Sequence, residues 1–252
     1  MSEDVVSRGV AVAAVELTIG APLVRDPVWA AAVAQDWAAT AAANPRLWNG
    51  SFFLFEDVVL EPGKQFAATA RPTDFATFLH WRRPVEPDDR FMHVFPVAAV
   101  TTADGRLLVG VQSGTTANPG RAYPPSGSFD DDDRSADGRL DPIANMVREL
   151  AEEVGLDAAT LTAEPGFTVI ASGPRRRALV KRWRTDARAE DLAPRLSAHV
   201  AADAHGELSA VRFLGFDERL AEAEGVPYVN RLLALLAAEA ERERSRTTAV
   251  GV

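Results

Sequence analysis

Nine consecutive residues near the middle of the chain concentrate charge in a pattern that could bind a cation. They are Arg148-Glu149-Leu150-Ala151-Glu152-Glu153-Val154-Gly155-Leu156. In an α-helix, at about 100° per residue, the three glutamates would fall within about a third of the circumference, where like charges repel. Hard divalent cations such as Mg²⁺ or Mn²⁺ relieve such repulsion, because they prefer carboxylate oxygens and often join protein carboxylates to the phosphates of a substrate.

The flanking residues predict the helix that presents these charges. Asp141 suits an N-cap, Pro142 suits the first helical position, and Gly155 suits the left-handed position after a helix end. They predict a helix from residue 142 to residue 154. Apolar residues recur within it at three- and four-residue spacing and predict a buried stripe, with the glutamates and Arg148 lying away from it. The stripe comprises Ile143, Met146, Val147, Leu150 and Val154.

The pattern resembles the signature of Nudix hydrolases. The second half of that signature, R-E-apolar-x-E-E-x-G-apolar, is matched at every defined position by residues 148–156. The family places it on a helix that follows a glycine-containing loop, and the loop here would be 122–130 around Gly127, in place of the family's P-G-G turn. A solvated helical face with Arg–Glu pairs is the alternative, but a cap, an apolar stripe and an upstream glycine loop favour a site.

The resemblance implies roles for the charged residues. Glu149, Glu152 and Glu153 would bind the metal, a backbone carbonyl near Gly127 would be a further ligand, and Arg148 would orient Glu152. The metal would be Mg²⁺ or Mn²⁺. The implied reaction is hydrolysis of a diphosphate bond in a nucleoside diphosphate linked to another moiety, because the metal neutralises phosphates and polarises a water.

The upstream half of the signature departs from the family spacing of Gly, five residues, Glu, seven residues and Arg. Counting forward from Gly127 puts the acidic position at Asp133, but fourteen residues then precede Arg148, which implies an insertion of seven. Counting back from Arg148 gives Leu140. The two counts leave the acidic position unassigned, and the four aspartates at 130–133 favour a solvated loop over an additional metal site.

Further candidates lie outside the signature. Glu207 begins the last predicted strand and could supply a base or another metal ligand, or it could merely follow the turn at 204–206. Arginine forks suit phosphate oxygens, so Arg121, Arg175 and Arg177 are candidate substrate-binding residues, with an exposed turn as the alternative for the latter two. Tyr123 could stack on a base or sugar, although buried aromatic side chains are commoner.

Composition limits the class of protein. The chain has 252 residues, of which 47% are hydrophobic and 25% charged, so it can bury one large core or two modest ones. It has no cysteine, which excludes disulfides and thiolate metal sites, and its net charge of −9 argues against a nucleic-acid-binding surface. With neither a basic leader nor a long apolar run, we expect no membrane association and a cytoplasmic protein. Abundant arginine and alanine with two lysines suggest a bacterial source.

The order of predicted elements indicates an α/β fold. Residues 91–252 would form a Nudix-type α/β/α sandwich with a mixed sheet and a C-terminal helix from Pro227 to about Arg246, and residues 1–90 an N-terminal α+β extension. The predicted strands of the first part are 91–102, 106–112, 167–172, 177–185 and 207–214; those of the extension are 10–19, 51–60 and 65–70, with helices at 27–43 and around 75–79.

The extension and the C-terminal helix leave several hypotheses open. Short strings at 44–50 and 73–75 resemble the N-terminal region of Nudix enzymes that cleave UDP-sugars, so a nucleotide sugar is the first candidate substrate. The C-terminal helix could pack on the core or on a second copy, giving a homodimer. A Nudix-fold nucleotide sensor without activity is an alternative function, opposed by the three glutamates and favoured by the altered loop. Cleavage of oxidised nucleoside triphosphates would leave the extension without a role.

Overall fold

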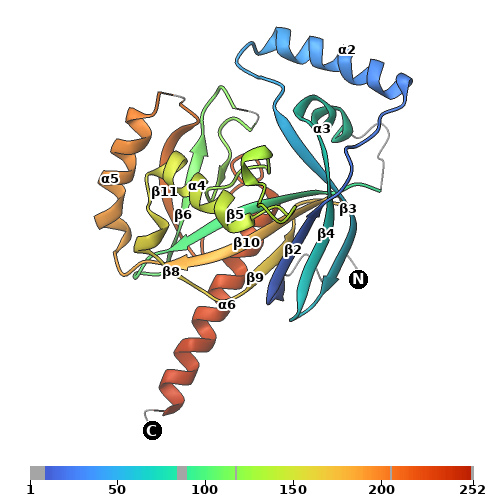
Figure 1. Ribbon diagram of the computed structural model, residues 1–252. Helices are drawn as coiled ribbons and strands as arrows, with labels where there is room; N and C mark the ends of the chain where they lie inside the picture. Colours follow the sequence, from blue (N-terminus) through green and yellow to red (C-terminus); the bar gives the residue numbers. More distant parts are fainter. Residues whose placement is uncertain (1–8, 84–89, 117, 205, 251–252) are drawn as a thin grey trace.

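The computed structural model describes residues 9–83, 90–116, 118–204 and 206–250, which form two β-sheets and the helices α2 to α6 (Figure 1). The large sheet has the strand order β1-β9-β10-β5-β6-β11, with β7 paired to β6 and β8 to β10. β5 and β10 run parallel and the other neighbours are antiparallel, so the sheet is mixed. Its strands are β1 Val10–Val12, β5 His93–Thr101, β6 Arg106–Gln112, β7 Ala122–Tyr123, β8 Thr162–Ala163, β9 Phe167–Ala171, β10 Arg176–Arg184 and β11 Leu208–Gly215.

Helices cover both faces of the large sheet. α4 Pro142–Val154 and α5 Ala189–Ala202 share a core cluster with Ala98 and Val100 of β5. α6 Pro227–Val250 packs against Val97 and Ala99, the alternating residues of the same strand. Because side chains alternate across a strand, β5 is buried along its whole length. The prediction of an α/β sandwich around a mixed sheet is confirmed, and α6 packs on the core of its own chain.

The small sheet has the order β2-β4-β3 and carries two helices. Its elements are β2 Ala14–Ile19, β3 Ser51–Glu61, β4 Gln65–Asp74, α2 Pro27–Ala43 and α3 Phe75–Trp81. The β-prone segment from Val10 to Ile19 forms two strands, not one. It breaks at Ala13, because the amides of Ala13 and Ala14 both donate to the carbonyl of Lys64, which sends β1 to the large sheet and β2 to the small one.

The two sheets share a core. Phe53, Phe55 and Phe66 of the small sheet pack with Val94 and Leu179 of the large one. The division near residue 90 stays a prediction, and residues 84–89 beside it lie outside the described residues. No helix in the described part of the chain is long and apolar enough to cross a membrane.

The insertion before α4 is a small hairpin attached to the small sheet. Arg134 pairs with Leu140 across it, and Arg139 pairs with Thr18 of β2. The amide of Ile19 donates to the carbonyl of Gly138 at 3.0 Å, and the amide of Leu140 to the carbonyl of Leu17 at 2.9 Å. An ion pair of 2.7 Å joins Arg139 to Glu16. Residues 134–140 therefore extend the free edge of β2.

The packing of α4 can be tested by unfolding. Leu150 is fully buried, whereas Val147 on the same helix is 38% exposed. We expect Leu150→Ala to lower the free energy of unfolding in urea by about 2–5 kcal/mol, because it leaves a cavity in the core. Val147→Ala should change it by less than about 0.5 kcal/mol. Equal losses from the two variants would contradict this packing.

Candidate functional site

The helix α4 begins and ends where the sequence predicts. The side chain of Asp141 accepts hydrogen bonds from the amides of Ile143 (2.8 Å) and Ala144 (3.0 Å), and Gly155 has a φ of 68°. A Cβ on Gly155 would also lie 2.6 Å from the ring of His199, whose Nε2 is 2.9 Å from the carbonyl oxygen of Glu152. Both the backbone angle and the close approach of α5 therefore require glycine here.

None of the three glutamates belongs to the apolar core cluster that α4 shares with the large sheet, yet two of them are buried. Glu149 and Glu153 are each only 9% exposed, whereas Val147, predicted in the buried stripe, is 38% exposed. The side chain of Glu152 is 64% exposed. The reason is that α4 is covered from two directions, by the large sheet and by the loop that contains Gly127.

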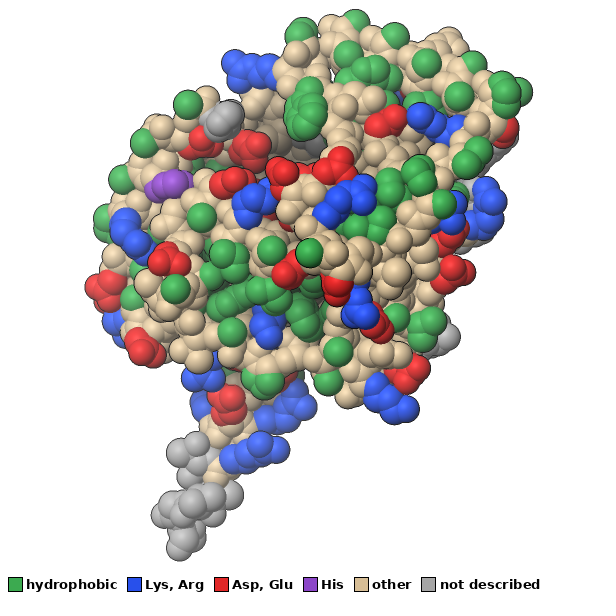
Figure 2. All heavy atoms as spheres, viewed as in Figure 1, with side chains coloured by type: hydrophobic (Ala, Val, Ile, Leu, Met, Phe, Trp, Pro, Cys, Tyr) green, Lys and Arg blue, Asp and Glu red, His purple; other side chains and the backbone are tan. Residues whose placement is uncertain are grey.

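Gly127 brings the loop backbone directly against α4. A Cβ at this position would lie 2.1 Å from Oε1 of Glu149, so no other residue fits without displacing that carboxylate. Ser126, Gly127 and Ser128 line a cavity of about 710 Å³ together with Glu149 and Glu153. We call this the acidic cavity. In Figure 2, acidic side chains gather around a recess between α4 and the part of the molecule that carries α2 and α3.

Burial and mutual repulsion shift the titration of the two buried glutamates. The pKa of Glu149 is raised to about 7, chiefly by burial; the charge of Arg148 opposes this rise, and the charges of Glu152 and Glu207 add to it. The pKa of Glu153 is raised well above its ordinary value by burial and then by the charges of Glu149 and Glu207. Glu207 is therefore close enough to Glu149 and Glu153 for its charge to raise the pKa values of both. Glu149, Glu153 and Glu207 all line the acidic cavity.

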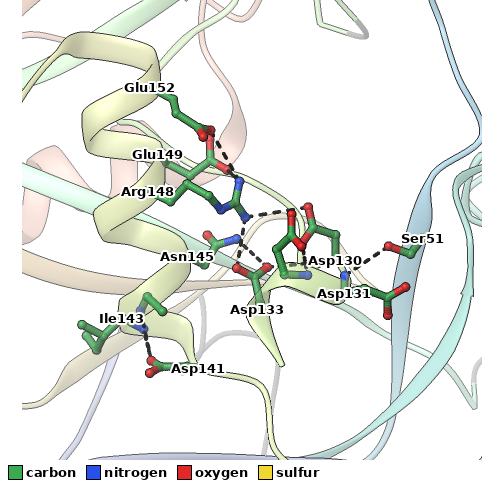
Figure 3. Close-up of polar contacts among 12 residues, drawn as sticks. Ser51, Asp130, Asp131, Asp133, Asp141, Ile143, Asn145, Arg148, Glu149 and Glu152 are labelled. Atoms are coloured by element: carbon green, nitrogen blue, oxygen red, sulfur yellow. Dashed lines mark hydrogen bonds and ion pairs between the residues drawn. The ribbon is translucent and has the colours of Figure 1, made fainter. Parts of the chain in front are cut away.

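Arg148 makes its shortest contacts with residues other than Glu152 (Figure 3). Its Nη2 is 3.0 Å from Oδ1 of Asp133, and its Nη1 is 3.1 Å from Oε1 of Glu149. The distance to Oε2 of Glu152 is 3.6 Å, and that to Oδ2 of Asp130 is 3.8 Å. The guanidinium thus joins the preceding loop to α4, and its pairing with Glu152 is the looser, exposed part of this arrangement.

Asp133 is the residue that sequence reasoning left unassigned. It ends the short 3₁₀ helix η1 Asp131–Asp133 and is 2% exposed, so the expectation that 130–133 is a solvated loop is wrong at this position. Its Oδ2 accepts hydrogen bonds from Nδ2 of Asn145 (2.9 Å) and the amide of Asp130 (3.0 Å). The forward count from Gly127 identifies it, and the hairpin 134–140 accounts for the extra length before Arg148.

The structure separates the remaining candidates. Tyr123 lines the acidic cavity, as does Glu207, whose carbonyl accepts a hydrogen bond from the amide of Ser113 at the end of β6. The middle residue of the turn at 204–206, which the alternative for Glu207 invoked, lies outside the described residues. Glu207 thus lines the same cavity as Glu149 and Glu153, and its chemical role stays a prediction.

The three predicted arginines lie elsewhere. Arg121 donates to the carbonyls of Glu222 and Gly225, the latter at 2.6 Å. The guanidinium of Arg175 lies 4.4 Å from the Trp81 ring centroid, and Arg177 donates to the carbonyl of Gly173 at 3.2 Å. The arginine of the acidic cavity is Arg46, and Arg176, between the two predicted residues, lines a second and smaller cavity. Adjacent residues of a strand such as β10 face opposite sides of the sheet. The sequence therefore indicates that neighbouring arginines point in opposite directions, but not which of them points toward the cavity.

The carboxylates suit a hard divalent cation in chemical type. Among the described residues, no three acidic, histidine or cysteine side chains converge closely enough to form a complete cage for a metal. Mg²⁺ commonly takes one or two protein carboxylates and completes its shell with water and substrate phosphates. Buried glutamates that repel one another and share a cavity with Glu207 fit that mode of binding.

Comparisons with known proteins give a fold-level likeness. No family model matches the chain, and no curated protein matches it. Similar solved structures include a mutT/nudix family protein from Listeria innocua, at 17% identity over 63% of this chain and 97% of that one (TM-score 0.40). A MutT protein from Methanosarcina mazei Go1 is 15% identical over 60% and 95% (TM-score 0.38), and the Nudix hydrolase RenU from M. Smegmatis is 14% identical over 63% and 86% (TM-score 0.31). Their names are those of the family that residues 148–156 resemble.

The burial of Glu153 predicts a pH-dependent stability in metal-free buffer. Its raised pKa means that the folded state holds a proton that the unfolded chain releases near the ordinary value of 4.5, so stability is lost as pH rises through the folded pKa. Glu153→Gln removes this loss. We expect the variant to melt about 2–4 °C higher than the wild type at pH 8, with a smaller gain at pH 5. A gain that does not change between these pH values would contradict the assignment.

Proposed function

We propose that the protein hydrolyses a diphosphate bond in a nucleoside diphosphate linked to another moiety, with Mg²⁺ or Mn²⁺ bound. The observation that supports this most strongly is the placement of Glu149, Glu153 and Glu207 on one cavity, two of them buried with raised pKa values. Buried carboxylates without matching positive charge are unfavourable. A divalent cation supplies that charge, and phosphates are the substrate groups that such a cation holds best.

Each residue of the site would have a distinct role in this reaction. Glu149 and Glu153, with Glu152 from the exposed side of α4, would hold the metal, which when bound polarises water and neutralises phosphate charge. Arg148 holds the carboxylate of Glu149 in place through its contact at 3.1 Å. Glu207 would take a proton from the attacking water or serve as a further ligand. Gly127 leaves room for the Glu149 carboxylate and places its own backbone beside it.

The opposite wall of the acidic cavity favours a nucleoside. It is formed by the segment 46–52, in which Trp48 is 77% exposed. The Trp48 ring lies over Gly50, where a Cβ would come within 2.6 Å of it. A large aromatic ring that packs on backbone and remains mostly exposed in a cavity is suited to stacking on a base. The volume of about 710 Å³ accommodates a nucleotide with a linked group.

The finer proposal is that the linked group is a sugar. It draws support from the resemblance of residues 44–50 to enzymes that cleave UDP-sugars, and these residues include the Trp48 that lines the cavity. A nucleoside triphosphate would also place a base against Trp48, so what favours a linked sugar is the resemblance of residues 44–50.

Turnover tests the proposal directly. Purified protein with Mg²⁺ or Mn²⁺ is offered UDP-sugars, ADP-ribose, NADH, dinucleoside polyphosphates and nucleoside triphosphates, and released phosphate groups are measured. We expect cleavage of at least one diphosphate, lowered about 100-fold or more by Glu153→Gln, since a metal ligand is lost. Glu190→Gln, which changes an exposed glutamate on α5, is the control and should keep the wild-type rate. Wild-type turnover in Glu153→Gln would overturn the site; nucleotide binding without any turnover would favour the sensor.

If Trp48 stacks on the base, its removal should raise KM without lowering the melting temperature. We expect Trp48→Ala to raise KM about tenfold or more for the best substrate, because base stacking on an aromatic side chain contributes about 1–3 kcal/mol. Its melting temperature should stay near that of the wild type, since the side chain is mostly exposed. Val28→Ala, which alters an 81% exposed residue of α2, is the matched control. An unchanged KM in Trp48→Ala would place the base elsewhere.

A further inference from the structure

A second cavity of about 140 Å³ lies behind the loop that contains Gly127. Tyr123, Ser126, Gly127 and Ser128 line both this cavity and the acidic cavity, so the two adjoin along this loop. One water molecule occupies about 30 Å³ in the liquid, so the space admits a small polyatomic ion. The remaining lining residues are His93, Phe95, Asn118, Ser172, Arg176, Val226 and Tyr228.

The cavity contains the half-buried guanidinium of Arg176, which has no carboxylate partner among the described residues. Arg176 and His93 are paired in register at the starts of the parallel strands β10 and β5, and the Arg176 guanidinium lies 5.2 Å from the Phe95 ring centroid. Among the described residues no carboxylate forms an ion pair with Arg176, and its buried Nε makes no hydrogen bond. Burial lowers the pKa of Arg176, and the charge of Arg82 lowers it further. A cation whose Nε is buried without a hydrogen bond, and which has no carboxylate partner, is left under-compensated unless a ligand supplies the missing charge.

The other polar groups of this cavity are neutral. Burial raises the pKa values of Tyr123 and Tyr228, so both phenols stay protonated. The pKa of His93 is lowered well below its ordinary value by burial and by the charges of Arg176 and Arg82. Its Nδ1 and the hydroxyl of Ser172, both in residues that are 4% exposed, are buried without a hydrogen-bond partner. The lining includes no acidic residue.

One guanidinium surrounded by neutral hydroxyl and imidazole groups matches an oxyanion in charge and in hydrogen-bonding type. A phosphoryl group, with three or more oxygens, can use donors that approach from several sides, whereas a carboxylate has two oxygens in one plane. We propose that this cavity is a phosphoryl-binding subsite centred on Arg176, which takes inorganic phosphate or the terminal phosphoryl group of a nucleotide. Only the assignment of that group to the substrate rests on the proposed function.

Binding of inorganic phosphate to the full chain tests the subsite without turnover. Titration calorimetry in metal-free buffer should show one phosphate site in the wild type, and Arg176→Gln should weaken it at least tenfold. Arg184→Gln, near the other end of the same strand with a side chain 61% exposed, is the control and should bind like the wild type. An absence of phosphate binding to the wild type, or equal binding to Arg176→Gln, would overturn the proposal.

Stability separates a ligand-binding arginine from a structural one. Without phosphate, Arg176→Gln should melt at or above the wild-type temperature, because it removes a half-buried charge that has no carboxylate partner among the described residues. The rise in melting temperature that phosphate causes should disappear. A lower melting temperature without phosphate would show that Arg176 serves the fold and would overturn the proposal. Ser172→Ala, a smaller change in the same cavity, should weaken phosphate binding about threefold or more.

Two further arms identify the source of the phosphoryl group. A nucleoside monophosphate that competes with inorganic phosphate assigns the subsite to the substrate or product, whereas independent binding assigns it to free phosphate. Glu153→Gln should bind phosphate at least as tightly as the wild type while losing turnover. Phosphate binding in a protein that cleaves no diphosphate would therefore contradict the proposed function and leave the subsite established.

Discussion

The guanidinium of Arg148 joins α4 to the loop that precedes it, and so fixes the position of Glu149 at the acidic cavity. Arg148 lies between Asp133 of the preceding loop and Glu149 of its own helix, at 3.0 and 3.1 Å. Asp133 is buried and also accepts a hydrogen bond from Asn145, so the loop is attached to α4 at two points. Removing one member of such a buried group leaves the others with uncompensated charge. Glu149, thus fixed, lies against Gly127, while Glu153, among the described carboxylates of α4, is left without an arginine partner.

The same loop joins the two walls of the cavity. Immediately after Asp133 the chain forms the hairpin 134–140, which pairs with the edge of β2 in the small sheet. The amide of Asp131 donates to Oγ of Ser51 at 3.1 Å, and the guanidinium of Arg134 lies 5.0 Å from the Phe53 ring centroid. These contacts place β3 and the segment that carries Trp48 opposite the glutamates. The hairpin 134–140, which lengthens the spacing before Arg148, is thus the part that connects the N-terminal strands to α4.

The sequence predicts the elements whose limits are set locally. The bounds of α2 and α4 follow from Asp26 and Asp141, each followed by a proline, and the limits of β6 follow from its apolar run between turns. Features that depend on tertiary contacts are not predictable in this way. A helical stripe does not reveal that a loop will cover Glu149 and Glu153, and the spacing rule could not choose Asp133 before the hairpin was known. Likewise, three consecutive arginines at 175–177 do not show which one faces inward until the pairing of β10 is fixed.

The distribution of charge across the loop 123–128 favours a phosphorylated ligand over other acidic compounds. On one side lie carboxylates that need a cation, and on the other lies the Arg176 guanidinium, which needs an anion. The two groups line different cavities that share Ser126, Gly127 and Ser128, and among the described residues no ion pair joins Arg176 to these carboxylates. A divalent cation on the first side and a phosphoryl oxyanion on the second would satisfy both. The affinity of metal and phosphate should therefore depend on residues from both sides of one loop, which the glycine at 127 allows to pack tightly against α4.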